Sequence, residues 1–355
     1  MFREFEYEFV NHLINCEEFN NDRYLQSRKI IMNIVHKSYD ELFSLDNIFR
    51  AWEIFRRGKA SKADVMDFEM HLEDNIFCLF EQLHNSQYKH SPYKYFQIFD
   101  NKKRDIYKAE VRDRIVHQII YEYLLLLFKP IFIRDSYASL IDKGQYHAIN
   151  AFRYFTKLAM GHKNNCYVLK CDVRKYFDNI DQNILFSLIK EKISCGKILG
   201  IIKEIMSSYD SIHLGKGIPL GNVTSQIFAN IYLNVLDQYV KHEQKCRFYV
   251  RYNDDIVIVS RNKVELEKIR DKIIVFVKYK LSSEIPFEKT SIRKIGWGMD
   301  FLGFTILSKA VLLRDKTKNK MYSNINQENI HSYFSILKHC NSYNLRKKII
   351  SRFDK

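Results

Sequence analysis

A pair of adjacent aspartates between two β-rich runs is the feature that most constrains what this chain can fold into. The runs read RFYVRY over 247–252 and IVIVS over 256–260, and Asn253, Asp254 and Asp255 join them. Such a pattern predicts an antiparallel hairpin with acids at its tip. Adjacent carboxylates repel each other, so the step is either a solvated acidic turn or a site where cations neutralise the acids.

A third acid ends a second predicted strand. The apolar run CYVLKCD over 166–172 has the length of a strand, so the side chain of Asp172 is expected to project from the edge of a sheet. The carboxylates of Asp172, Asp254 and Asp255 suit two Mg²⁺ ions about 3.5 to 4 Å apart, the arrangement that phosphoryl transfer uses. We therefore expect a two-metal site at these acids.

Helical and extended segments interleave through the middle of the chain. Asp181 and Asn262 each precede an amphipathic segment and are expected to cap its helix. Thr224 or Ser225 is expected to cap the long helix that follows a glycine-punctuated loop at 214–222. Interleaved strands and helices with hairpins favour an α+β fold, in which helices cover one face of a sheet.

Residues 1–90 predict helices almost throughout. Apolar side chains repeat at helical spacing over 45–55 and stop at Gly58, and Ser61 and Asp64 form a capping-box pattern that opens a further helix. No linker that would mark independent domains is evident in the rest of the chain. Beyond 310 the chain is basic and is expected to be helical.

The charge balance indicates a polyanionic partner. The chain has 57 Lys and Arg against 42 Asp and Glu, a net charge of +15, and 14% of its residues are aromatic. Lysine and arginine bind phosphates and aromatic rings stack on bases, although lysine-rich surfaces also serve solubility. An extended stretch from Tyr93 leads into a basic turn at 101–106 and then a helix that runs to Pro130.

A membrane partner is not expected. The longest apolar stretch, 123–128, is far shorter than the roughly 20 residues that a spanning helix needs, and the N-terminus carries charges throughout. We therefore expect a cytoplasmic protein.

Taken in order, several segments resemble the sequence boxes of reverse transcriptases. YNDD at 252–255 resembles the Tyr-x-Asp-Asp box, and KCDVRKYFDNID at 170–181 resembles the first acid box of the palm. The remaining boxes are finger segments at 112–118 and 136–149, the nucleotide-binding loop and helix at 217–234, and the primer-grip hairpin at 300–304.

The resemblance implies an α+β, right-hand polymerase fold with a helical N-terminal extension. The implied regions are a helical N-terminal region at 1–90, fingers at 91–165, a palm with part of the fingers and the primer-grip hairpin at 166–307, and a short basic thumb at 308–355.

The resemblance also assigns the catalytic residues. Asp172 and Asp254 would be the principal ligands of two Mg²⁺ ions, for which Mn²⁺ is an alternative, and the backbone carbonyl of Val173 would complete one site. Asp255 would be a further ligand or an electrostatic support. Lys289 resembles the palm lysine that protonates pyrophosphate, although a solvated strand lysine is the alternative.

The incoming nucleotide would meet several further residues. Phe177 matches the aromatic gate that excludes a ribose 2′-hydroxyl, with a core aromatic as the alternative interpretation. Arg104 resembles the finger arginine that clamps the triphosphate, with Lys102 or Lys103 as its companion. Gly221 would let the backbone approach the template pair, where a Cβ would collide with a base.

Two positions depart from most reverse transcriptases and match the diversity-generating retroelement type. Leu220 stands before the glycine where most have glutamine, and Gln226 follows Ser225. Leu220 has no side-chain hydrogen bond to offer, so reduced fidelity is implied. The residues that would bind nucleic acid are Phe301, Leu302 and Gly303 in the primer grip and Lys338, Arg346, Lys347 and Lys348 in the thumb.

The implied function is an RNA-directed DNA polymerase that copies a structured noncoding RNA into cDNA from a DNA or RNA primer, with a small basic accessory protein. The sequence leaves three alternatives open: a reverse transcriptase of an anti-phage defence system, a DNA-templated polymerase, and an RNA-binding scaffold that retains the fold without catalysis. The RNA, the priming mode and the oligomeric state are not determined by the sequence.

Overall fold

The computed structural model describes residues 38–99, 103–140, 142–161, 165–209 and 214–353. Residues 1–37 of the expected helical region, and Lys102, lie outside the described residues. Among the helices that are described, none is long and apolar enough to span a membrane.

A helical layer precedes the sheet elements, as expected for the described part of 1–90. In the second of its helices Trp52 is fully buried. The expected capping box at Ser61 is wrong: the third helix begins at Ala63 with Lys62 as its N-cap and no side-chain bond. Asp64 cannot complete such a box, because its carboxylate forms ion pairs with Lys108 and Arg114. The helices are α3 (Tyr39–Leu42), α4 (Leu45–Arg56), α5 (Ala63–Met70) and α6 (Leu72–His84).

A two-stranded hairpin and a long helix follow. The strands β1 (Lys94–Phe99) and β2 (Lys103–Lys108) pair antiparallel, with Ile98 opposite Arg104. The predicted basic turn at 101–106 is therefore too long, because β2 already begins at Lys103. The helix α7 (Val111–Phe128) contacts α4 and also α12 (Val223–Gln238).

The central sheet has four antiparallel strands in the order β4-β5-β3-β6. Along β5, Ile256 and Ile258 belong to one apolar core, whereas Val257 and Val259 belong to another. Both faces of this strand are therefore apolar and both need a cover. The strands are β3 (Tyr167–Asp172), β4 (Tyr249–Tyr252), β5 (Asp255–Ser260) and β6 (Ser291–Lys294).

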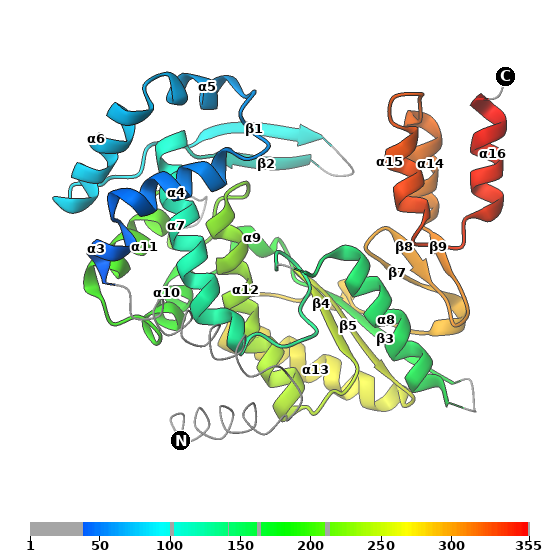
Figure 1. The fold of residues 1–355 in the computed structure, drawn as a ribbon. Helices are drawn as coiled ribbons and strands as arrows, with labels where there is room; N and C mark the ends of the chain where they lie inside the picture. Colours follow the sequence, from blue (N-terminus) through cyan, green and yellow to red (C-terminus); the bar gives the residue numbers. More distant parts are fainter. Residues whose placement is uncertain (1–37, 100–102, 141, 162–164, 210–213, 354–355) are drawn as a thin grey trace, which may run out of the picture.

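Helices cover both faces of this sheet, so the prediction of one covered face is wrong. The helix α13 (Lys263–Lys280) contacts β3, β5 and β6, and α8 (Gln145–Met160) contacts β4 and β5 (Figure 1). Phe152 of α8 lies in the core of Val257 and Val259. Both faces are covered because the side chains of β5 are apolar in a continuous run, whereas a strand with one covered face would alternate apolar and polar residues.

In the middle of the chain, two of the three capping predictions are confirmed. Asp181 caps α10 (Gln182–Lys190) and Asn262 caps α13, each through its side-chain oxygen. For α12 the N-cap is Asn222, not Thr224 or Ser225, which are buried inside its first turn. The remaining helices of this region are α9 (Tyr176–Asn179) and α11 (Gly196–Ser207).

The C-terminal part begins with a small sheet rather than with helices. The third strand of this sheet lies beyond residue 310, where helix was expected, because it pairs with the preceding hairpin. In Figure 1 the helices that follow stand at upper right, α3–α7 stand at upper left, and the palm sheet lies between and below them. The elements are β7 (Met299–Phe301), β8 (Phe304–Ile306), β9 (Val311–Leu313), α14 (Asp315–Asn324), α15 (Ile330–Leu337) and α16 (Tyr343–Phe353).

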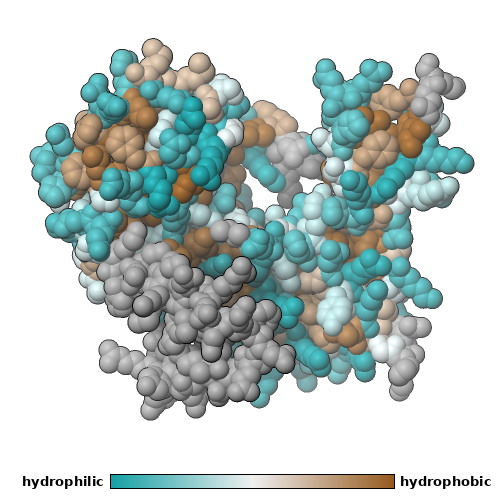
Figure 2. Space-filling model, in the orientation of Figure 1, coloured by the Kyte–Doolittle hydropathy of each residue, from teal (hydrophilic) through white to brown (hydrophobic). Residues whose placement is uncertain are grey.

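The face of the molecule drawn in Figure 2 is mainly hydrophilic, with hydrophobic patches among the hydrophilic side chains. Figure 2 shows these patches over the α5–α6 layer and over the helices at upper right. On the first of them Met66, Met70 and Phe77 are exposed.

Candidate active site

The three acids meet at one end of the central sheet. Asp172, the last residue of β3, is the register partner of Asp255, the first residue of β5. Asp255 in turn pairs with Tyr252 of β4, and Asn253 and Asp254 form the turn between the two strands, with φ of +50° at Asn253. Register partners in an antiparallel sheet project from the same face, so the hairpin with acids at its tip is confirmed.

Two of the three acids at this end have a lysine partner. The Nζ of Lys289 lies 3.5 Å from Oδ1 of Asp172, and the Nζ of Lys170 lies 3.1 Å from Oδ1 of Asp255. Burial, together with the charges of Asp255 and Asp172, raises the pKa of Asp254 to about 6. Three acids close enough to disturb one another are a site that gains from added positive charge.

The side chains of the three acids do not by themselves form a set of ligands around one point. Within the described ranges, no group of three His, Cys, Asp or Glu side chains is arranged to hold a metal ion. The donors nevertheless have the right chemistry, because carboxylate and carbonyl oxygens are the ligands that Mg²⁺ prefers. Val173, whose carbonyl was assigned to one ion, follows Asp172 and is buried.

Lys170 contacts one of the three acids, and the motif analysis missed it. Its Nζ contacts Asp255 and also donates a hydrogen bond of 3.1 Å to the backbone carbonyl of Asp300, at the start of the β7–β8 hairpin. It therefore joins the acid hairpin to the hairpin expected to be the primer grip. The strand period of two could have found it, because Lys170 and Asp172 share a face of β3.

Arg251, directly before the Tyr-Asn-Asp-Asp box, supports the turn from inside the protein. It is fully buried; its Nη2 lies 2.6 Å from Oδ2 of Asp237, and its Nη1 donates to the carbonyl of Asn253 at 3.2 Å. Burial opposes its charge, but Asp237 holds the pKa of Arg251 above its ordinary value. The sequence indicates this buried ion pair, because a charged residue inside an apolar strand needs a partner.

The nucleotide-binding loop packs against β2. Gly221 has a φ of +118°, and a Cβ there would lie 2.8 Å from Cγ2 of Ile106. The carbonyl of Leu220 accepts a hydrogen bond of 2.9 Å from the Tyr107 amide. The approach of β2 is thus one reason for a glycine here, and the expected approach to a template base stays a prediction.

The other residues assigned to the nucleotide lie near this loop or on β2. Phe177 is half-buried, and its carbonyl accepts a hydrogen bond of 2.9 Å from the Ile218 amide, which ties the gate position to the loop. Gln226 is exposed in the first turn of α12. Arg104 is exposed on β2, and no ion pair joins it to another residue in the described part of the chain.

The primer-grip residues form a tight turn. Phe301 is buried against Phe152, with 5.5 Å between ring centroids. Leu302 and Gly303 connect β7 to β8 with φ of +49° and +83°.

The basic thumb residues assigned to nucleic acid differ in their contacts, and their binding role stays a prediction. Lys338, Lys347 and Lys348 are exposed, as expected of residues that bind a nucleic-acid backbone. Arg346 is instead used inside the thumb: its Nη2 donates to the carbonyl of Leu337 at 2.7 Å and its Nε to Ser342 Oγ at 3.0 Å. It satisfies the end of α15, where helix carbonyls lack partners.

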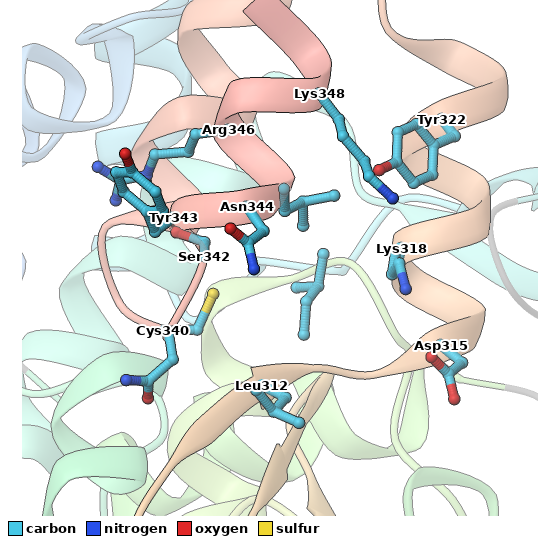
Figure 3. Close-up of a pocket in the computed structure, with 13 residues that line it drawn as sticks. Leu312, Asp315, Lys318, Tyr322, Cys340, Ser342, Tyr343, Asn344, Arg346 and Lys348 are labelled. Atoms are coloured by element: carbon cyan, nitrogen blue, oxygen red, sulfur yellow. Dashed lines mark hydrogen bonds between the residues drawn. The ribbon is translucent and has the colours of Figure 1, made fainter.

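A cleft of about 690 Å³ lies between α14 and α16, with Leu312 of β9 at its floor. Figure 3 shows Lys348 of α16 pointing across this cleft toward Tyr322 and Lys318 of α14. The C-terminal helices therefore form a basic cleft with an aromatic ring, beside β9, the strand that leads into α14.

Comparison with known proteins identifies the family. Residues 89–306 match the family model described as reverse transcriptase (RNA-dependent DNA polymerase), which is more than half of the chain. This chain belongs to the reverse transcriptase family. The match includes the three acids, the nucleotide-binding loop and the primer-grip hairpin, and it confirms the predicted right-hand polymerase fold. The domain boundaries, the metal ions and the diversity-generating subtype stay predictions.

Two curated relatives of this reverse transcriptase share part of its length. Protein YkfC of Escherichia coli is 26% identical over 257 residues, which cover 61% of this chain and 66% of YkfC. The group II intron-encoded protein LtrA of Lactococcus lactis is 21% identical and the match covers 79% of this chain and 58% of LtrA. The chain thus spans two thirds or less of these relatives.

Among solved structures, apo telomerase from Candida tropicalis is similar in fold, with a TM-score of 0.49 and 16% identity over 66% of this chain and 59% of that chain. 

Proposed function

We propose that this reverse transcriptase catalyses RNA-directed DNA synthesis by two-metal nucleotidyl transfer. The observation that carries the proposal is the pairing of Asp172 with Asp255 across β3 and β5, with Asp254 in the adjoining turn. The family match makes nucleotides and a template the substrates that these acids would serve.

In this proposal Asp172, Asp254 and the carbonyl of Val173 hold two Mg²⁺ ions, with Mn²⁺ as an alternative. When bound, such ions lower the pKa of a primer 3′-hydroxyl and stabilise the pyrophosphate that leaves. Asp255 acts as an electrostatic support rather than as a ligand, because Lys170 neutralises it at 3.1 Å. Lys289, exposed and 3.5 Å from Asp172, is placed to donate a proton to pyrophosphate.

Two side chains would select the nucleotide. Phe177 is the aromatic gate against a 2′-hydroxyl, and its hydrogen bond to Ile218 supports this because it places the gate beside the nucleotide-binding loop. Arg104 binds the triphosphate. Lys103 is disfavoured as its companion, because neighbouring residues of a strand point to opposite faces.

The template would be a cognate structured noncoding RNA, copied into cDNA from a DNA or RNA primer. We place the enzyme in a diversity-generating retroelement, with a small basic accessory protein, on the apolar Leu220 before Gly221 and on Gln226. The alternative is an anti-phage defence system, which the helical layer α3–α6 before the fingers also suits.

The test is primer extension on an RNA template with Mg²⁺ and dNTPs. The wild type is compared with an Asp254→Asn, Asp255→Asn double variant and with Asp271→Asn, a control acid on the exposed side of α13. We expect DNA from the wild type and the control and none from the double variant. RNA binding by all three proteins without DNA from any would instead support the scaffold alternative, and extension on DNA templates alone would support a DNA-templated polymerase.

The biological setting is decided by the product made at the native locus. Sequencing the cDNA against its RNA should reveal errors concentrated opposite template adenines if the enzyme diversifies genes. Faithful or repetitive cDNA would favour defence.

A further inference from the structure

A fully buried histidine on α7 takes no part in the site described above. His117 has none of its surface exposed, and both of its ring nitrogens have partners. Nε2 lies 2.9 Å from Nε2 of His90, and Nδ1 lies 2.6 Å from Oγ1 of Thr224. Thr224 is itself fully buried, in the first turn of α12.

The partners determine which nitrogen carries each proton. Nδ1 of His90 lies 2.6 Å from the carbonyl oxygen of Ser91, and a carbonyl can only accept, so His90 carries its proton on Nδ1. Nε2 of a neutral His90 is then an acceptor, and His117 must donate to it from Nε2. Nδ1 of His117 is left as an acceptor for the Thr224 hydroxyl. The hydrogen bonds therefore run in one direction, from Thr224 through His117 and His90 to Ser91.

This chain of hydrogen bonds ends at the nucleotide-binding loop. Thr224 follows that loop directly, and Asn222, the N-cap of α12, is bonded to the Tyr107 carbonyl at 2.8 Å and to the Ala109 amide at 3.3 Å. The loop is thus held at two points, by β2 through Asn222 and by α7 through Thr224. The second point depends on neutral histidines.

The surroundings favour the neutral form of both rings. Burial lowers the pKa of His117, and the charges of His90 and Arg114 lower it further. Burial also lowers the pKa of His90, where Arg112 acts in the same direction and Asp113 and Glu204 oppose it. The charged groups around the pair are Arg112, Asp113 and Arg114 of α7, Glu204 of α11 and Lys89, which pairs with Glu204.

We propose that the ordered chain Thr224–His117–His90–Ser91 holds the nucleotide-binding loop against the fingers and thereby sets the affinity for the incoming nucleotide. His117, His90 and Thr224 are positioning residues that act through the loop, not catalytic residues. This inference rests on the proposed polymerase function, which names the ligand of the loop.

The decisive variants are Thr224→Val and Thr224→Ser. Valine keeps the shape of threonine but removes the hydroxyl, which leaves Nδ1 of the buried His117 without a partner; serine keeps the hydroxyl. A buried group without a hydrogen-bond partner costs free energy, which here falls on the position of the loop. We therefore expect the KM for dNTP to rise about tenfold in Thr224→Val, and kcat to change less than about twofold. Thr224→Ser should stay within about threefold of the wild type for both constants.

A second variant avoids dependence on one substitution. Asparagine at position 90 can still donate to the Ser91 carbonyl, but it removes the acceptor for Nε2 of His117. His90→Asn should therefore raise the KM for dNTP in the same direction as Thr224→Val. A loss of kcat without a change in KM, in either variant, would overturn the positioning role.

The pH dependence gives a further readout. Because burial lowers the pKa of both histidines, the wild type and Thr224→Ser should show a rising KM for dNTP only at pH values below the ordinary histidine pKa of about 6.5. Thr224→Val, in which the loop is already released, should show a flatter curve. Parallel curves for all three proteins would contradict the inference.

Amide hydrogen exchange tests the same idea without any catalysis. Peptides that cover 217–226 should exchange faster in Thr224→Val and in His90→Asn than in the wild type, while Thr224→Ser is unchanged. Equal exchange in all four proteins would overturn the inference even if the enzyme is active. A wild type that makes no DNA but shows this exchange pattern would overturn only the proposed polymerase function.

Discussion

Asp254 is the residue at which the fold most strongly opposes an ionised side chain. It lies in a tight turn beside two other acids, and burial and their charges raise its pKa to about 6. For an acid with a raised pKa, the contribution to stability is present at low pH and is lost as the pH rises through the folded-state value. In the metal-free protein, ionised Asp254 therefore destabilises the fold above about pH 6.

We predict that Asp254→Asn stabilises the metal-free protein. In EDTA at pH 8 the variant should exceed the wild type in free energy of unfolding by about 1 kcal/mol, and the difference should vanish only below about pH 4, where the carboxyl is protonated in the unfolded chain as well. Denaturant unfolding at the two pH values measures this. Adding Mg²⁺ at pH 8 should raise the stability of the wild type more than that of the variant, whereas equal responses would contradict a metal site at Asp254.

Lys170 is the second residue that decides the geometry of the site. It holds Asp255 and the Asp300 carbonyl at once, each at 3.1 Å. Lys170→Met keeps the length of the side chain and removes its charge, so Asp255 is left unpaired and the two hairpins lose their tie. We expect primer extension to fall about tenfold or more, in line with the loss of a charged hydrogen bond. Lys170→Arg is the matched control and should retain more activity than Lys170→Met; equal losses would argue against the charge as the cause.

At the scale of elements, the contact between the nucleotide-binding loop and β2 joins the fingers to the palm. The sequence predicted that Gly221 approaches a template base, and the structure adds a contact within the protein, with Ile106, and a φ of +118°. The contact between β2 and this loop, which are far apart in the sequence, therefore favours glycine at position 221.

Gly221→Ala should destabilise the protein by about 1 to 3 kcal/mol, because the new Cβ would clash with Ile106 and the backbone conformation is strained for alanine. Gly200→Ala, in α11 where a Cβ meets nothing within 4 Å, is the matched control and should be neutral or stabilising. Thermal unfolding of the two variants measures the difference. If Ile106 is the obstacle, Ile106→Ala should recover part of the loss in Gly221→Ala.

At the scale of the whole molecule, a net charge of +15 makes salt-dependent binding to nucleic acid the expected behaviour. The sequence assigned both Lys348 and Arg346 to nucleic-acid binding, but the two residues have different contacts in the structure. Both line the cleft between α14 and α16, but Lys348 points across it (Figure 3), whereas Arg346 is bonded to Leu337 and Ser342.

We predict opposite consequences for these two neighbours. Lys348→Gln should weaken binding to a template–primer duplex and lower the slope of log affinity against log salt by about one, because one phosphate contact is lost. Arg346→Gln should lower the melting temperature of the protein and leave the salt slope unchanged. Fluorescence anisotropy over a salt series and thermal unfolding of both variants separate the two effects, and equal slopes for Lys348→Gln and the wild type would remove Lys348 from the interface.

The sequence by itself determined the acids, the hairpin between 249 and 260 and the helices capped by Asp181 and Asn262, because turn residues, strand periodicity and caps are local signals. Motif order also placed the chain among reverse transcriptases. Tertiary structure alone decided what depends on distant contacts. The side chain of Asn222, the N-cap of α12, bonds to Tyr107 of β2, Arg346 donates a hydrogen bond to the end of α15, and His117 meets Thr224 across 107 positions of sequence. Such pairings are set by how elements pack, and no local pattern encodes them.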